Sequence, residues 1–244
     1  MKKVLLVTGG GRGIGAAIAR LAATQGYSVA VNYHNDETAA NSLAKEIGGI
    51  AIQADVSMPE DVVRMFDEIE KHFGIPTHVV NNAGITGKSS RLVDADIATI
   101  KRVIEINLLG KIYVAREAVK RMSTRLGGTG GSIVNISSAA AILGSPGEYV
   151  WYAASKGGVE SLTYGLAKEV AEEGIRVNAV VPGMIETEIH EKSTGDVGRV
   201  ERIRPSIPMK RIGKPEEIAE AVMFLLSDAS SYTTGSCLRV SGGR

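Results

Sequence analysis

Cysteine, tryptophan and phenylalanine are scarce in this chain of 244 residues. It has one cysteine, Cys237, one tryptophan and three phenylalanines, and aromatic residues make up 5% of the total. A single cysteine excludes an internal disulfide and fits a reducing compartment, so we expect a cytoplasmic protein. The neighbouring Leu238 and Val240 favour a small buried side chain at Cys237 over a reactive thiol.

An excess of charge of either sign is also missing. Lysine and arginine total 28 against 27 acidic residues, which gives a formal net charge of +1. This near equality of positive and negative charges argues against nucleic acid or an anionic membrane as the main partner. No apolar run approaches the roughly 20 residues of a membrane span, and the amino-terminal run is too short for a signal peptide. We therefore expect a soluble protein.

Metal-ligand spacing is the third absence. The four histidines, His34, His72, His78 and His190, show no such spacing, so no metal site is expected. Glycine, in contrast, is abundant: 29 glycines predict many tight turns or close backbone approaches.

The amino-terminal segment combines a buried strand, a glycine-rich turn and a helix. The apolar run 4–7 is followed by a turn from Thr8 to Gly15 and then by helical periodicity. Glycines let the backbone approach a pyrophosphate, and the helix amino terminus faces its charge. A turn without a ligand is the alternative, but the flanking strand and helix favour dinucleotide binding. The expected contacts are Gly9, Arg12, Gly13, Ile14 and Gly15.

The end of the second predicted strand, residues 27–33, bears on the type of dinucleotide. An NAD site usually places a carboxylate there, roughly 20 residues after the glycines. Here the strand ends in Asn32 and Tyr33, and no acid precedes Asp36. Arg12 could meet a 2′-phosphate, although a solvated turn residue is a serious alternative. The sequence favours NADP(H) over NAD(H).

The third and fourth strands also end in polar residues. Asp55 and Val56 follow strand 50–55, where Asp55 could accept from an adenine amino group or cap the helix that begins near Pro59. Strand 77–80 is followed by Asn81, and then by three further residues expected at the cofactor cleft: Asn82, Ala83 and Gly84.

Asn107 interrupts an apolar stripe in a helix predicted from Ile100 to Met122. A buried amide has to be hydrogen-bonded, or it costs a few kcal/mol. Asn107 is either a structural plug or a functional group that fixes a water, and both alternatives stay open.

Tyr152 and Lys156 are four residues apart in an Ala-rich segment that predicts a helix. They would share one helix face, where an ammonium lowers a phenol pKa that is otherwise near about 10. Such a tyrosine can exchange a proton near neutral pH. Taken alone, the pair fits an ordinary solvated helix face better.

Strand and helix alternate along residues 1–244 without a linker or a repeat. This pattern predicts a single α/β domain, a Rossmann fold whose doubly wound parallel sheet of about seven strands carries helices on both faces. Residues 184–210 lack periodicity and contain Pro205 and Pro208, so we expect a mobile lid there.

In order and separation, the motifs together resemble the short-chain dehydrogenase/reductase family over essentially the full length. The matching positions are Thr8-Gly9-x-x-x-Gly13-x-Gly15, Asn81-Asn82-Ala83-Gly84, Asn107, Ser138, Tyr152-x-x-x-Lys156 and Pro182-Gly183.

The resemblance implies an NADP-dependent enzyme acting on a small-molecule carbonyl or alcohol. Tyr152 would be the general acid and base, and Lys156 would lower its pKa and bind the nicotinamide ribose. Ser138 would hydrogen-bond the substrate oxygen, and Asn107 would fix a water that relays protons. The nicotinamide end would contact Pro182, Gly183 and Thr187. A homotetramer or homodimer is implied as well.

The general resemblance is to 3-oxoacyl-thioester reductases and to glucose- or polyol-type dehydrogenases. Glu172 and Glu173 have the wrong sign for docking an acidic acyl carrier protein, although the basic residues Lys120, Arg121 and Arg125 could compensate. The alternative of another class, a non-catalytic dinucleotide sensor, is disfavoured because Tyr152 and Lys156 are both present.

Two local features bear on the substrate side. The Ser138–Tyr152 spacing is one residue longer than is commonest in the family, so the loop that contains Glu148 has to bulge. Ser137 offers a second hydroxyl, but it should face away from Ser138 because successive side chains on a strand alternate.

Overall fold

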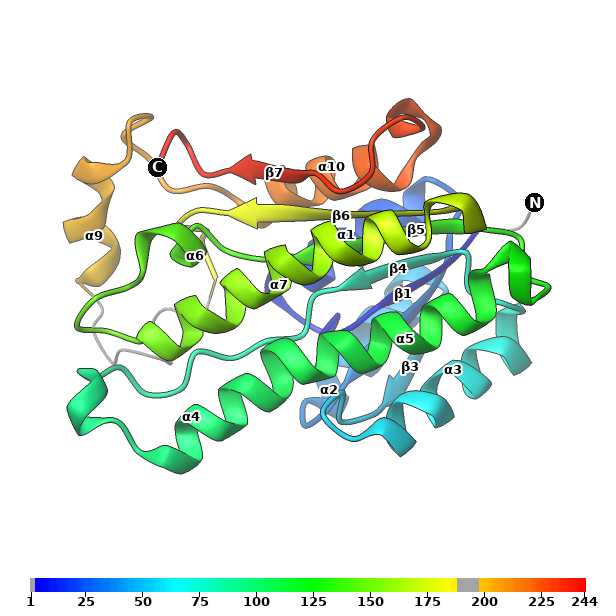
Figure 1. Cartoon of the computed structure of the whole chain (residues 1–244), viewed down its shortest axis with the longest axis horizontal. Coiled ribbons are helices and arrows are strands. Elements are labelled where there is room, and N and C mark those ends of the chain that lie inside the picture. The colour runs from blue at the N-terminus through cyan, green and yellow to red at the C-terminus, as the bar shows by residue number, and fades with distance from the viewer. Residues whose placement is uncertain (1–2, 188–197) are drawn as a thin grey trace.

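The computed structural model describes residues 3–187 and 198–244. Its strands form one parallel sheet in the order β3-β2-β1-β4-β5-β6-β7 (Figure 1). The strands are β1 Val4–Val7, β2 Ser28–Tyr33, β3 Ile50–Gln53, β4 His78–Asn81, β5 Gly131–Ile136, β6 Ile175–Pro182 and β7 Cys237–Val240. The predicted doubly wound Rossmann-type α/β fold is confirmed. His190 and residues 188–197 of the predicted lid lie outside the described residues.

Both faces of the sheet are covered because the central strands are apolar on both sides. In β1, Leu5 and Val7 pack into one core cluster, and Val4 and Leu6 pack into the other. Three helices cover the first face: α1 Gly13–Thr24, α2 Glu37–Ile47 and α10 Pro215–Leu226. Three cover the second: α3 Pro59–Phe73, α5 Gly110–Met122 and α7 Val150–Glu169. In Figure 1, α5 and α7 cross in front of the strands.

The chain order reverses at β1, which pairs with β2 on one side and with β4 on the other. In an open parallel sheet, a crevice forms at the carboxyl ends of the strands at such a switch point. The short helices α6 Ala140–Leu143 and α9 Arg199–Ile203 lie at this end of the sheet (Figure 1). Single 3-10 turns occupy residues 92–94, 124–126, 171–173, 204–206 and 228–230.

The helix predicted from Ile100 to Met122 begins earlier and changes its winding partway. It starts as α4, Ile97–Ile104, where the Asp96 side chain accepts from the Ala98 and Thr99 amides. A π-helical turn, Glu105–Leu109, then joins α4 to α5. Asn107 lies in this turn. Turns of this kind are rare and occur often at functional sites.

Cys237 corrects one sequence expectation. It lies on β7, an edge strand that pairs only with β6, and its side chain is half-buried rather than buried. Burial still raises the pKa of its thiol, which disfavours a reactive thiolate. In the part of the chain that the structure describes, no helix is long and apolar enough to span a bilayer.

Candidate functional site

A single cleft at the carboxyl end of the sheet collects the predicted cofactor residues. Its walls include Gly9, Arg12, Gly13, Ile14, Gly15, Asn32, Tyr33, Asp55, Val56, Asn82, Ala83, Gly84, Pro182, Gly183 and Thr187. Ser138, Tyr152 and Lys156 line the same cleft. Of the predicted catalytic residues, Asn107 alone stands back from the wall, fully buried behind it. The structure thus brings together residues that are up to 178 positions apart, from Gly9 to Thr187.

The glycine turn leaves space and free amides at the start of α1. Gly9 and Gly13 have φ angles of +60° and +54°, which L side chains rarely adopt. A Cβ on Gly15 would lie 2.5 Å from the Gly9 carbonyl oxygen, so this position has no room for a side chain. No side chain caps α1, whose first amides therefore remain available to an anion. The turn fits a pyrophosphate.

Asparagines hold the turn in place. The Asn82 amide donates to the Thr8 and Gly9 carbonyls at 2.9 and 3.0 Å, and the Asn32 side chain accepts from the Gly9 amide at 3.2 Å. Asn32 also donates to the Ala54 carbonyl at 3.1 Å and is almost wholly buried. Its side chain therefore braces the cleft from behind.

Arg12 is exposed at the outer end of the turn, beyond the carboxyl end of β2. Its guanidinium lies 3.8 Å from the Asp36 carboxylate. Asp36 also accepts from the Ala39 amide, which caps α2. The carboxylate of Asp36 is thus already paired within the protein.

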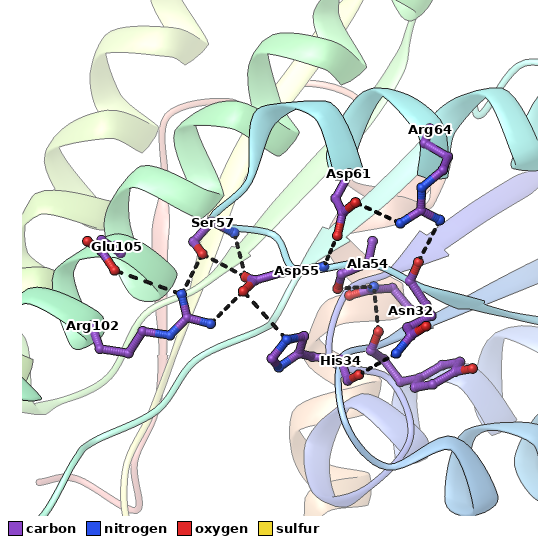
Figure 2. Close-up of polar contacts among 11 residues, drawn as sticks. Asn32, His34, Ala54, Asp55, Ser57, Asp61, Arg64, Arg102 and Glu105 are labelled. Atoms are coloured by element: carbon purple, nitrogen blue, oxygen red, sulfur yellow. Dashed lines mark hydrogen bonds and ion pairs between the residues drawn. The ribbon is translucent and has the colours of Figure 1, made fainter.

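Asp55 lies at the centre of a polar network (Figure 2). Arg102 of α4 donates to its carboxylate at 2.6 Å, and the Ser57 hydroxyl donates at 2.7 Å. The His34 Nε2 is 3.5 Å away. Burial raises the pKa of Asp55, but the hydrogen bonds from Ser57 and Arg102 outweigh it and leave that pKa below its usual value.

The idea that Asp55 caps α3 is wrong. The residue before that helix is Met58, and no side chain caps its first turn. The Asp55 carboxylate instead closes a local turn through the Ser57 amide at 2.9 Å. An adenine contact of Asp55 stays a prediction.

Tyr152 and Lys156 lie on α7 as predicted, but the pKa of Tyr152 is shifted the other way. Burial raises it, and the hydrogen bond with Ser138 and the charge of Arg199 offset only part of the rise. The Lys156 ammonium donates to the Ile136 carbonyl at 3.0 Å and lies 5.5 Å from the centre of the Tyr152 ring. Burial lowers the pKa of Lys156 to about 8. Desolvation therefore shifts the pKa of Tyr152 in the direction opposite to the one that the helix spacing predicted.

The two serines after β5 separate as expected. The Ser137 hydroxyl lies 3.2 Å from the Lys156 carbonyl and 3.0 Å from the Glu160 carboxylate. The Ser138 oxygen accepts from the Ala140 amide at 3.2 Å and is hydrogen-bonded to Tyr152. Ser138 is thus the hydroxyl beside the tyrosine.

Asn107 braces the wall of the cleft. Its Oδ1 accepts from the Ile85 amide and its Nδ2 donates to the Ile85 carbonyl, both at 2.8 Å. Nδ2 also lies 3.2 Å from the Ser155 hydroxyl. These contacts give the Asn107 side chain a structural role, and its role in fixing a water stays a prediction.

Sequence reasoning missed an ion pair beside the tyrosine. Arg199 of α9 is buried and donates to Glu148 at 2.7 and 2.9 Å and to the Tyr149 hydroxyl at 2.6 Å. In the loop before α7, Ser145 has a φ of +45°, and the bulge expected for this loop stays a prediction. The extra residue in that loop was the available signal, but nothing in the sequence indicated the partner of Glu148.

Comparisons with known proteins show what the whole chain is similar to. The family model described as Enoyl-(Acyl carrier protein) reductase matches residues 9–244. The chain is 50% identical over 246 residues to the uncharacterized oxidoreductase YgfF of Escherichia coli (strain K12), covering 99% of each chain. It is 37% identical to glucose 1-dehydrogenase 2 of Bacillus subtilis (strain 168), over 99% of this chain and 94% of the relative. It is 41% identical to the 3-oxoacyl-[acyl-carrier-protein] reductase of Homo sapiens, over 100% and 98%.

Proposed function

The chain belongs to the short-chain dehydrogenase/reductase family of oxidoreductases, and we propose that it transfers hydride reversibly between NADP(H) and a small ketone or secondary alcohol. One observation carries the proposal. Ser138, Tyr152 and Lys156 open into the same cleft as the glycine turn at Gly9–Gly15. A proton donor and a dinucleotide cradle thus share one space.

The walls of the cleft fit a dinucleotide along their whole length. The free amides of α1 would hold the pyrophosphate, Asp55 the adenine, and Pro182, Gly183 and Thr187 the nicotinamide end. The dinucleotide would supply the hydride, while the protein orients the carbonyl and manages one proton.

Tyr152 would donate the proton to the substrate oxygen. A raised pKa keeps its phenol protonated at neutral pH, which suits a general acid in carbonyl reduction. Ser138 would hydrogen-bond the same substrate oxygen and hold it near the phenol. Lys156 would bind the nicotinamide ribose. Asn107, whose side chain holds Ile85 at the cleft wall, would fix a water that relays protons from Lys156. In the reverse direction, the Tyr152 phenolate would accept the proton of the alcohol.

The surroundings of Arg12 support NADP(H) over NAD(H). No carboxylate follows β2 before Asp36, and Asp36 is occupied by Arg12 and by the cap of α2. An arriving 2′-phosphate would meet the Arg12 guanidinium, which pairs well with phosphate oxygens. The exposed Arg12 could turn from Asp36 to the phosphate.

The basic residues that could receive an acidic carrier protein are already paired with acids. Lys120 and Arg121 both pair with Glu117, and Arg125 lies 2.7 Å from Glu172. This internal pairing supports a small free carbonyl as the substrate. Reduction of a 3-oxoacyl-[acyl-carrier-protein] is the second candidate, favoured by the name of the human relative.

A substrate panel tests these proposals. Purified protein would be mixed with NADPH or NADH and with small ketones, a diketone or a 3-oxoacyl thioester, and glucose would be tried in the oxidative direction. We expect NADPH oxidation with a free carbonyl. Turnover of the thioester alone would favour the second candidate. Tight NADPH binding with no turnover on any substrate would favour a non-catalytic dinucleotide sensor.

We further propose a homotetramer or homodimer that acts in the cytoplasm, with residues 1–244 as one domain. Exposed apolar side chains around the start of α4 support an assembly, because Val93 and Ile97 are 78% and 68% exposed. Light scattering of the purified protein would measure the assembly, and a monomer at all concentrations would contradict it.

A further inference from the structure

Lys111, near the start of α5, is fully buried. Its Nζ donates to the Asn81 carbonyl at the end of β4. In the described ranges, 3–187 and 198–244, no carboxylate forms an ion pair with it. A buried lysine without an acid is costly and uncommon.

Burial, together with the nearby charge of Lys156, holds the pKa of Lys111 well below its usual value. Lys156 lies on α7, while β4 presents Asn81, which does not titrate. The folded protein therefore disfavours the charged form of the Lys111 side chain. A methionine of similar length would fill the same space without burying an amine.

Lys111 and Asn81 form two reciprocal hydrogen bonds. While its Nζ donates to the Asn81 carbonyl, the Asn81 side chain donates to the Lys111 carbonyl at 2.9 Å. Asn81 leads directly into the cleft wall formed by residues 82–85. Lys111 thus attaches Asn81, the residue before that wall segment, to α5.

The other end of the segment is fastened by the same continuous helix. Asn107, one turn before Lys111, holds the amide and the carbonyl of Ile85. Between the two ends, the Thr8 hydroxyl accepts from the Asn82 and Ala83 amides at 2.9 and 3.0 Å. The wall between Asn81 and Ile85 is therefore clamped at both ends from one side.

We propose that Lys111 is a positioning residue for the dinucleotide cleft: its amine holds the Asn81 carbonyl, and with Asn107 it fixes the wall segment 82–85. The proposal rests on the dinucleotide-dependent function proposed above. It gives a reason for an amine in a place where an apolar side chain would be more stable, because functional sites often retain groups that reduce stability.

The test compares Lys111→Met with wild type and with Lys120→Met, a control on the more exposed side of α5. Amide exchange at Asn82 and Ala83 and NADPH binding would be measured, and neither readout requires turnover. We expect Lys111→Met to speed exchange at both amides and to weaken NADPH about fivefold, as for one lost hydrogen bond. Lys120→Met should change neither. Unchanged exchange and binding in Lys111→Met would overturn the proposal.

Thermal melting gives an independent readout. The pKa of Lys111 is lower in the folded state than in the unfolded chain, so its burial destabilises the fold more at neutral pH than as the pH approaches about 10. We expect Lys111→Met to melt above wild type at pH 7, by a margin that shrinks at alkaline pH. A variant that melts below wild type at pH 7 would contradict a buried amine that destabilises the fold.

Lys111→Gln covers the case in which Lys111→Met does not fold. Glutamine keeps an N–H donor for Asn81 but carries no charge, so it should hold NADPH binding and exchange near wild type. Losses as large as those of Lys111→Met would contradict a clamp made by this hydrogen bond. If wild type reduces no carbonyl, the proposed function fails, while amide exchange still tests the clamp.

Discussion

The ammonium of Lys156 lies 5.5 Å from the centre of the Tyr152 ring, one helical turn along α7, and both groups are buried. Burial shifts their pKa values in opposite directions, raising that of the phenol and lowering that of the ammonium to about 8. At neutral pH the site therefore holds a protonated phenol beside a charged lysine. This is the state needed to protonate a carbonyl oxygen.

Replacement of the phenol tests this assignment. Tyr152→Phe should lower the turnover number about 10²–10⁴-fold, the usual contribution of a general acid, with little change in NADPH affinity. Tyr164→Phe is the matched control, because Tyr164 lies on α7 with its side chain 45% exposed. Steady-state kinetics and NADPH titration measure both effects. Near-normal turnover in Tyr152→Phe would remove Tyr152 from the mechanism.

The pH dependence of carbonyl reduction should follow Lys156. Because its pKa is lowered to about 8, its charge is complete well below that pH and is lost as the pH rises through about 8. We expect the rate of reduction to be level near neutrality and to fall through this range as the ribose contact weakens. A rate that stays constant to pH 10 would show that the charge of Lys156 does not matter.

Substitutions at two arginines should distinguish contacts with the 2′-phosphate from contacts with the rest of the dinucleotide. Arg12→Ala should weaken NADPH about tenfold and NADH little, since a charged hydrogen bond contributes roughly 1.5–3 kcal/mol. Arg102→Ala should weaken both nucleotides alike, because Arg102 positions Asp55, which is proposed to contact the adenine that both share. Calorimetric titration gives all four affinities. Equal losses for Arg12→Ala would mean that it contacts no 2′-phosphate.

His78 should make the fold sensitive to acid. Burial, with the charges of Lys3 and Arg176, lowers its pKa to about 4. Below about pH 6.5 His78 binds a proton in the unfolded chain but not in the folded chain. The free energy of unfolding therefore falls by up to about 3 kcal/mol between pH 6.5 and pH 4.

Urea melts across this range measure the loss. His78→Gln should flatten the fall, while His72→Gln, at an exposed position, should keep it. An identical fall in both variants would place the acid sensitivity elsewhere.

Much of the site could be predicted because parallel strands bring their carboxyl ends to one edge. The glycine turn follows β1, Asn82 follows β4, Ser138 follows β5, and Gly183 follows β6. Once the alternation of strands and helices is recognised, these residues have to gather. The Rossmann-type fold and the walls of the cleft therefore follow from local patterns.

Burial and long-range pairing could not be predicted in the same way. The pKa of Tyr152 depends on how many groups surround it, and helix spacing alone does not report that number. Nothing in the sequence around Lys111 indicates that its side chain is buried. Nothing around Glu148 indicates that it pairs with Arg199. Cys237 looks apolar among its neighbours, but its strand lies at the edge of the sheet.

Transfer of deuterium from stereospecifically labelled NADPD to a carbonyl substrate tests the central claim most directly. The product would be analysed by mass spectrometry for wild type and Tyr152→Phe. We predict that wild type places deuterium on the carbinol carbon and that Tyr152→Phe does so at least about 10²-fold more slowly. Tight binding of NADPD with no deuterium in any product would contradict an enzyme that reduces carbonyls.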